Sequence, residues 1–286
     1  MVTANRIRLT GLLRRSPLRW ASLCALVFVA NAAAAPPSVN APIPKEPAPM
    51  ARTLVQTTAD LEKAIGNWNP KSTAAPQTVV LLALYQQRIY RLLTRDSSLA
   101  AHTLALVPRD LQKVSRDLLA AQRELYRLTP PIGVHAIKVA RARPAPELLS
   151  YYREAQCRFK IPWNALAAVN FVETKFGKLR SASAAGAQGP MQFMPATWRR
   201  YGLGGSVQDA HDAILGAANY LHASGAPQDL RNALHHYNPS SAYVDAVVRY
   251  ARRIGADRTM FYALYNWQVF VKTPRGDRRV TGPGLP

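Results

Sequence analysis

Apolar residues recur at steps of three and four positions along most of the chain, the spacing that places them on one face of an α-helix. Proline or glycine stands where several of these runs start or stop, as is typical of helix boundaries. The period predicts helices over 54–65, 78–94, 99–107, 110–128, 162 to about 175, 195–202, 213–223, 228–236 and 241–254. Residues 267–283 alternate with period two around Pro-Arg-Gly-Asp, which predicts a β-hairpin. We therefore expect a mainly α fold with a short C-terminal β-hairpin.

The first 35 residues have the pattern of a secretory signal peptide. Five arginines between Arg6 and Arg19 precede an apolar run over 21–30, and small residues suited to cleavage follow in Asn-Ala-Ala-Ala-Ala. The apolar stretch over 20–35 is 16 residues long, shorter than the roughly 20 that a membrane-spanning helix needs. We therefore expect a secreted protein of the cell envelope, in the periplasm or the cell wall. An uncleaved N-terminal anchor is the alternative.

Proline-rich and basic stretches divide the rest of the chain. Six prolines over 36–50 indicate an extended spacer. The aromatic side chains that precede the hairpin are expected to pack rather than bind. The predicted parts are the Pro-rich linker over 36–50, a helical accessory region over 51–130, a basic linker over 131–146, a second helical domain over 147–258, and an aromatic segment with the tail over 259–286. The role of the accessory region is left open by its sequence, which carries no catalytic pattern.

The chain is strongly basic, with a net charge of +21. The leader holds five of the 37 Lys and Arg residues and none of the 16 acidic ones, so its removal leaves a net charge of +16. A surface of this charge attracts anionic polymers over long range. We expect a monomer. Because a secreted protein does not meet nucleic acid, the expected anionic partners are wall polymers or a membrane surface. A solvated basic surface without a specific partner is the alternative.

Glu173 interrupts an apolar helical stripe. Leu166, Val169, Glu173 and Phe176 follow one another at helical steps, which places this carboxyl on the face that otherwise packs into the core. Burial penalises the charged form of a carboxyl and raises its pKa, the property that a general acid requires. The alternative is that Glu173 pairs with a nearby lysine, or turns outward at the end of its helix.

Three ordered motifs favour the general acid. Glu-Thr-Lys-Phe-Gly at 173–177 is followed by Ser-Ala-Ser-Ala-Ala-Gly-Ala-Gln-Gly-Pro-Met-Gln at 181–192, and later by His-Tyr-Asn-Pro at 236–239. Together they resemble the lytic transglycosylases of the lysozyme-like superfamily, in particular those with a soluble-lytic-transglycosylase (SLT)-type domain. The resemblance covers about residues 147–254 and implies a lysozyme-like helical catalytic domain that acts on the glycan strands of peptidoglycan.

The resemblance also implies roles for individual residues. Glu173 is the expected catalytic residue, and Tyr237 is expected to border the cleaved bond. The expected substrate-binding residues are Ser183, Gly189, Met191, Gln192, Tyr237 and Asn238. Ser181 is the alternative to Ser183, because the loop between Glu173 and Gly186 is one residue longer than the commonest family form. For Tyr237 and Asn238 the alternative is an ordinary helix end.

No second carboxylate follows closely on Glu173, since positions 174–208 contain no Asp or Glu. Glycosidases that use water need such a partner, so the sequence favours a mechanism with one carboxyl. The resemblance implies cleavage of the bond between N-acetylmuramic acid and N-acetylglucosamine, with a 1,6-anhydromuramic acid end as the expected product. A hydrolytic muramidase and a non-catalytic wall-binding scaffold with a lysozyme-like groove are the alternatives.

No cofactor and no metal are expected. The six histidines form no zinc-binding spacing. Asp-Ala-His-Asp at 209–212 has the composition of a cation site, but a loop followed by an N-cap explains it better. In that interpretation Asp212 is the N-cap of the helix over 213–223.

Overall fold

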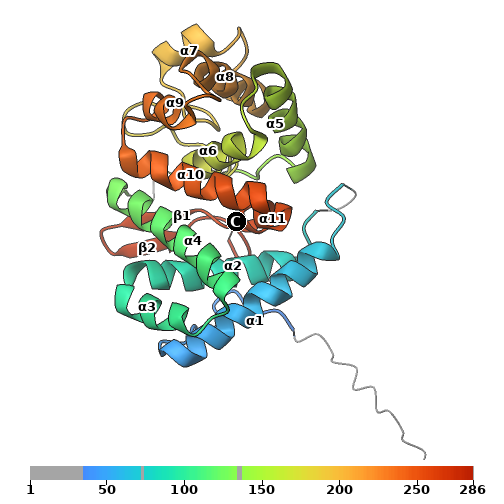
Figure 1. The fold of residues 1–286 in the computed structure, drawn as a ribbon, viewed down its shortest axis with the longest axis vertical. Coiled ribbons are helices and arrows are strands. Elements are labelled where there is room, and N and C mark those ends of the chain that lie inside the picture. The colour runs from blue at the N-terminus through green and yellow to red at the C-terminus, as the bar shows by residue number, and fades with distance from the viewer. Residues whose placement is uncertain (1–34, 72–73, 134–136, 286) are drawn as a thin grey trace, which may run out of the picture. The chain divides into compact units, whose positions relative to one another are not determined.

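The computed structural model describes residues 35–71, 74–133 and 137–285 (Figure 1). Of the leader predicted over 1–35, only Ala35 is among them, so the signal peptide stays a prediction. Within the described ranges, no helix is both long and apolar enough to cross a membrane.

The described residues form eleven helices and one two-stranded antiparallel hairpin, which confirms the mainly α fold. The elements are α1 (Pro47–Gly66), α2 (Gln77–Arg95), α3 (Ser97–Ala105), α4 (Arg109–Leu128), α5 (Ala145–Phe159), α6 (Trp163–Thr174), α7 (Pro195–Tyr201), α8 (Ala210–Ala223), α9 (Leu230–Tyr237), α10 (Ser241–Ala256), α11 (Arg258–Asn266), β1 (Phe270–Thr273) and β2 (Gly276–Arg279). The aromatic segment before the hairpin therefore folds as α11, where Phe261 is fully buried.

Two helices, α1 and α8, begin three or more residues before their predicted starts. Helix α1 begins at Pro47, inside the stretch expected to be a spacer, and Met50 is fully buried because it packs in the core. Helix α8 is capped by Asp209 rather than Asp212, since the Asp209 side chain accepts hydrogen bonds from the N–H groups of His211 and Asp212. Asp212 lies one turn further and accepts from the Ser206 N–H at 2.8 Å. The prediction of Asp212 as the N-cap was wrong.

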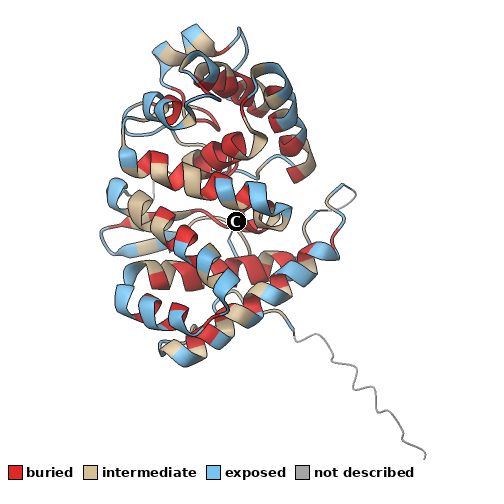
Figure 2. Cartoon of the chain, viewed as in Figure 1, coloured by how far each residue is buried: buried red, intermediate tan, exposed pale blue. Residues whose placement is uncertain are grey.

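The accessory helices share one hydrophobic core with the second domain. Helix α4 packs along α10, and α11 packs against α1 and α2 (Figure 1). The buried residues lie on the faces that these helices turn toward one another (Figure 2). Trp68, just after α1, meets Tyr262 of α11 edge-on with ring centroids 5.4 Å apart. Region 51–130 is thus docked on the second domain.

A charged cluster joins α4 to α10. The carboxylate of Asp117, a residue 5% exposed, accepts hydrogen bonds from Arg249 at 3.2 Å and Arg252 at 2.6 Å. Arg253 forms a third ion pair with the same carboxylate. Because a buried charge is costly without its partners, this cluster holds the accessory region to the helix that follows the third motif.

The predicted hairpin forms and closes on the accessory region. Thr273 pairs with Gly276, so residues 274–275 make the turn. Gly276 has a φ of +100°, which favours glycine. Asp277 in β2 is bound by Arg91 of α2 at 2.5 Å and by Arg95 at 3.3 Å. The hairpin is therefore tied by ion pairs to α2.

Candidate active site

Glu173 lies in the last turn of α6, a helix whose residues are mostly core. Leu166 and Val169 are fully buried, as the apolar stripe predicts, whereas Glu173 keeps partial exposure. Its Oε1 atom accepts a hydrogen bond of 2.6 Å from the hydroxyl of Tyr243 in α10. Tyr243 is only 3% exposed. The glutamate is thus held from the core side while its remaining surface stays open to a substrate.

The environment of Glu173 makes it a proton donor near neutral pH. Burial raises the pKa of Glu173 from 4.5 to about 7. The Tyr243 hydroxyl and the Lys175 ammonium favour the charged form and lower the pKa, but by less than burial raises it. Protonated and charged forms are therefore both populated near pH 7. Such a carboxyl can give a proton to a leaving oxygen and afterwards accept one.

The backbone turns sharply just after the glutamate. Lys175, Phe176 and Gly177 have successive φ values of +53°, +62° and +78°, a conformation that costs energy for residues other than glycine. Thr174 stabilises this turn. Its hydroxyl donates a hydrogen bond to the Pro190 carbonyl at 2.6 Å and accepts one from the Gly177 N–H at 2.8 Å. The end of α6 is in this way joined to the glycine-rich loop.

The glycine-rich loop closes as a tight turn between Gln188 and Phe193, whose backbones exchange hydrogen bonds of 2.9 and 2.8 Å. Gly189 has a φ of +73°, and a Cβ at this position would lie 1.8 Å from the Val207 carbonyl oxygen. Glycine is required at this position because the backbone of the loop at Val207 lies directly against it and leaves no room for a side chain. Gln192 has a φ of +50° and its side chain donates to the Gly189 carbonyl at 3.0 Å.

Met191 and Tyr237 form one unit behind this loop. Met191, one of the expected substrate-binding residues, is fully buried, so its side chain supports the loop from the core side. The hydroxyl of Tyr237 donates to the Met191 carbonyl at 2.6 Å. Burial and the nearby charge of Glu173 both raise the pKa of Tyr237 well above its ordinary value. Tyr237 is therefore near Glu173, but Tyr243 makes the direct contact.

The serines and Asn238 take part in local structure. Ser183 is exposed, and its Oγ accepts from the Ala187 N–H at 3.0 Å. Ser181 Oγ accepts from the Lys138 N–H at 2.7 Å. Of the two serines, Ser183 is the more open to a ligand. The Asn238 N–H donates to the Leu234 carbonyl at 3.0 Å, which ends α9.

The aspartates of the second domain that could act as a second carboxylate have partners of their own. Asp245 is bound by Arg231 at 2.6 Å. Three others are helix N-caps, namely Asp209, Asp229 and Asp257. Asp209, His211 and Asp212 place potential ligand atoms within 4.8 Å of one another, yet His211 Nε2 lies 2.9 Å from a Glu154 oxygen. The N-cap and these contacts account for the Asp-Ala-His-Asp motif.

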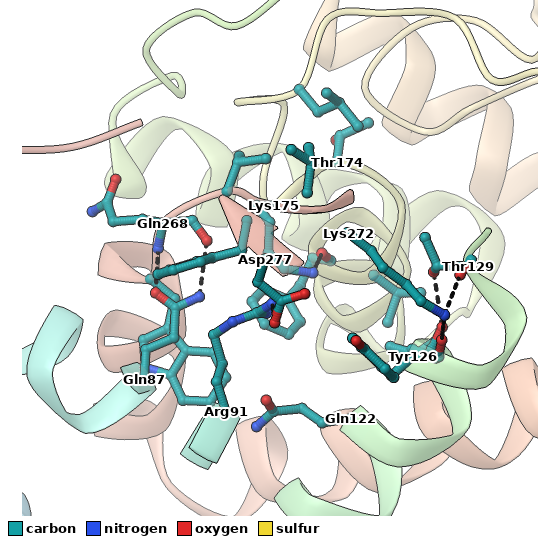
Figure 3. Close-up of a pocket in the computed structure, with 18 of the residues that line it drawn as sticks. Gln87, Arg91, Gln122, Tyr126, Thr129, Thr174, Lys175, Gln268, Lys272 and Asp277 are labelled. Carbon is teal, nitrogen blue, oxygen red and sulfur yellow. Dashed lines mark hydrogen bonds and ion pairs between the residues drawn. The ribbon is translucent and has the colours of Figure 1, made fainter. Parts of the chain in front are cut away.

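Glu173 also lines a cavity of about 270 Å³ between α2, α4, the end of α6 and the hairpin (Figure 3). Lys175 enters it from α6 and donates to the Phe171 carbonyl at 3.0 Å. Arg91 and Asp277 point toward each other across it (Figure 3). Neither this cavity nor Tyr243 was predicted. Tyr243 follows the third motif by four residues. A tyrosine so close to that motif was the one sign in the sequence of a second hydroxyl near Glu173.

The class of the second domain is given by a family model, and the fold and the site agree with it. A mainly helical chain presents a half-buried, protonatable glutamate at a helix end, beside a glycine-rich loop, the buried Tyr243 and the partly buried Tyr237. Residues 150–258 match the family model described as "Transglycosylase SLT domain". The chain therefore carries an SLT-type transglycosylase domain over these residues, and the sequence-based recognition is confirmed.

A curated relative agrees with this assignment. Membrane-bound lytic murein transglycosylase F of Thiobacillus denitrificans is 29% identical over 125 residues, which cover 41% of this chain. The matched part makes up 26% of the relative, so the chain spans about a quarter of that protein's length. No solved structure matches.

Proposed function

We propose that the chain is a lytic transglycosylase of the cell envelope that cleaves the bond between N-acetylmuramic acid and N-acetylglucosamine in peptidoglycan. The observation that carries the proposal is Glu173, a half-buried carboxyl with a pKa near 7 and a fixed hydrogen-bond partner. The SLT match over 150–258 and the relative named as a lytic murein transglycosylase support the substrate class.

One carboxyl is sufficient for the reaction. Protonated Glu173 gives its proton to the glycosidic oxygen as the bond from C1 to that oxygen breaks. The acetamido group of the muramic acid stabilises the positive charge that develops at C1. Glu173, now a carboxylate, accepts the proton of the C6 hydroxyl as O6 bonds to C1. The product is a 1,6-anhydromuramic acid end, no water is consumed, and Glu173 ends in its starting form.

The surroundings of Glu173 fit this sequence of proton transfers. The Tyr243 hydroxyl stabilises the carboxylate formed after the first transfer, while burial keeps the carboxyl protonated before it. A hydrolase would need a second carboxylate to act as nucleophile or to activate water. Among the described residues, the other carboxylate of the adjoining cavity is Asp277, which is already bound by Arg91 and Arg95.

The test is a digest of purified peptidoglycan by the chain from Pro36 onward, with Glu173→Gln as the matched variant. Mass spectrometry of the released fragments is expected to show products one water lighter than hydrolysis products, with wild type only. Fragments with added water would make the protein a muramidase. Binding to the wall without release of fragments by either protein would favour a non-catalytic scaffold.

A further inference from the structure

Unpartnered polar atoms are concentrated in the cavity beside Glu173. Among the described residues, four buried side-chain atoms that can form hydrogen bonds find no partner. Three of them belong to cavity-lining residues: Gln122 Nε2, Trp267 Nε1 and Asp277 Oδ1. Buried polar groups are normally hydrogen-bonded, so such a grouping indicates a ligand or ordered water. In Figure 3 Gln122 lies below Arg91 and Asp277 with no bond drawn to it.

The charge of the cavity selects an anion. Four cationic side chains line it against two acidic ones: Arg91, Arg95, Lys175 and Lys272 against Glu173 and Asp277. Asp277 is already bound by two of the arginines. Lys175 and Lys272 donate to backbone carbonyls, those of Phe171 for the first and of Tyr126 and Thr129 for the second. Among the described residues, neither ammonium group forms an ion pair with a carboxylate. Burial lowers the pKa of Lys175 to about 8, which still leaves it mostly charged at pH 7.

The donors and acceptors select a peptide among possible anions. Gln122 and Trp267 each offer an N–H to an oxygen, whereas Asp277 Oδ1 needs an N–H or O–H from the ligand. A peptide carrying a free carboxylate offers both kinds of group. Acetate offers oxygens but no hydrogen-bond donor, and an unsubstituted sugar carries no charge for the lysines. Hydrogen phosphate offers oxygens and an O–H, but none of the N–H groups that a peptide offers.

The cavity has room for such a group and a way in. Its volume of about 270 Å³ lies just below the about 300–1,000 Å³ of typical small-ligand sites, which suits one or two amino-acid residues. At its rim the side chain of Arg95 is 45% exposed and Ile132 is 37% exposed. A ligand entering there meets the accessory helices on one side and the end of α6 on the other.

We propose that this cavity binds a carboxylate-bearing peptide, and that its main source is the stem peptide attached to the muramic acid of the strand being cleaved. The identity of the peptide's source rests on the proposed function. The existence of a peptide-binding site does not. It gives the accessory region a role: α2 and α4 complete a binding site next to the candidate acid, so that strands with peptides are favoured over bare glycan.

The first test compares kcat/KM on glycan strands that carry stem peptides with kcat/KM on the same strands after an amidase has removed them. We expect a preference for the peptide-bearing strands. Because a hydrogen bond to a carboxylate is worth about 1.5 kcal/mol or more, Gln122→Met should lower that preference about tenfold. The control is Gln112→Met on the same helix, which loses its bond to Leu104 outside the cavity and should leave the preference unchanged.

The second test needs no turnover. Calorimetric titration of the free dipeptide L-alanyl-γ-D-glutamate into Glu173→Gln protein should give saturable binding, weakened about tenfold when Gln122→Met is added. If the dipeptide binds in this way but wild type shows no preference for peptide-bearing strands, the site is confirmed and its ligand is a free peptide. The proposal is overturned if wild type shows no preference and the dipeptide does not bind, since the cavity then holds water only. A lack of glycan cleavage would refute the proposed function but leave the titration decisive for the site.

Discussion

Replacing Tyr243 by phenylalanine removes one hydroxyl from the site and keeps the buried ring. That hydroxyl donates to Glu173 at 2.6 Å. A hydrogen bond to a charged group contributes about 1.5–3 kcal/mol, and a difference of about 1.4 kcal/mol between the two forms corresponds to one pH unit of pKa. Its loss should therefore raise the pKa of Glu173 from about 7 to about 8–9.

The assay is the dependence of kcat/KM on pH, which reports ionisations of the free enzyme. Glu173 must hold a proton to start the reaction, so activity falls as pH rises through its pKa. We expect the alkaline fall near pH 7 for wild type and about 1–2 pH units higher for Tyr243→Phe. Tyr237→Phe is the control, because its hydroxyl bonds to Met191 and should leave the fall in place. A fall that stays near pH 7, or moves to lower pH, in Tyr243→Phe would refute the reasoning.

Three further predictions concern stability and the loop. The pKa of Glu173 is higher in the folded state than in the unfolded state, so the protein loses stability as pH rises from 4.5 to about 7. This loss is of the order of 3 kcal/mol, and Glu173→Gln, which does not titrate, should not show it. Its Tm should exceed that of wild type at pH 8 and match it at pH 4; equal differences at both would contradict this. Gly189→Ala should abolish activity, since its Cβ meets the Val207 carbonyl, whereas Gly186→Ala, with open space, should lose about 1–3 kcal/mol of stability only. Asp117→Ala should lower the free energy of unfolding in urea by about 3 kcal/mol, and a change below 1 kcal/mol would show that the arginine cluster does not hold α4 to α10.

Helical periodicity predicted nine of the eleven helices of the described residues, because most of them are amphipathic and end at proline, glycine or a capping side chain. Helices α5 and α11 were not among the predicted ones. Periodicity was insufficient where two local signals compete. Asp209 and Asp212 are both good caps three residues apart, and the loop that delivers the Ser206 N–H to Asp212 decides between them. Likewise, the prolines before Met50 resemble a spacer, although Met50 itself is buried by packing against distant segments.

The candidate site was predictable in part. The carboxyl of Glu173 stands out because it interrupts an apolar stripe, a local property of the sequence. Its partner Tyr243 lies 70 positions away, and its hydrogen bond depends on how α10 crosses α6. Met191 shows the same limit, because its place in the second motif does not tell that its side chain points into the core. Contacts between distant segments are set by packing, which periodicity does not encode.

The most direct measurement for the central claim is the fate of water during cleavage. Peptidoglycan is digested by the chain from Pro36 onward in water labelled with oxygen-18, and the muramic acid ends are analysed by mass spectrometry. If Glu173 acts alone as acid and then base, the ends carry no label and are one water lighter than hydrolysis products, and Glu173→Gln yields none. Labelled, full-mass ends produced by wild type would contradict the account, because a second carboxylate would then have to activate water.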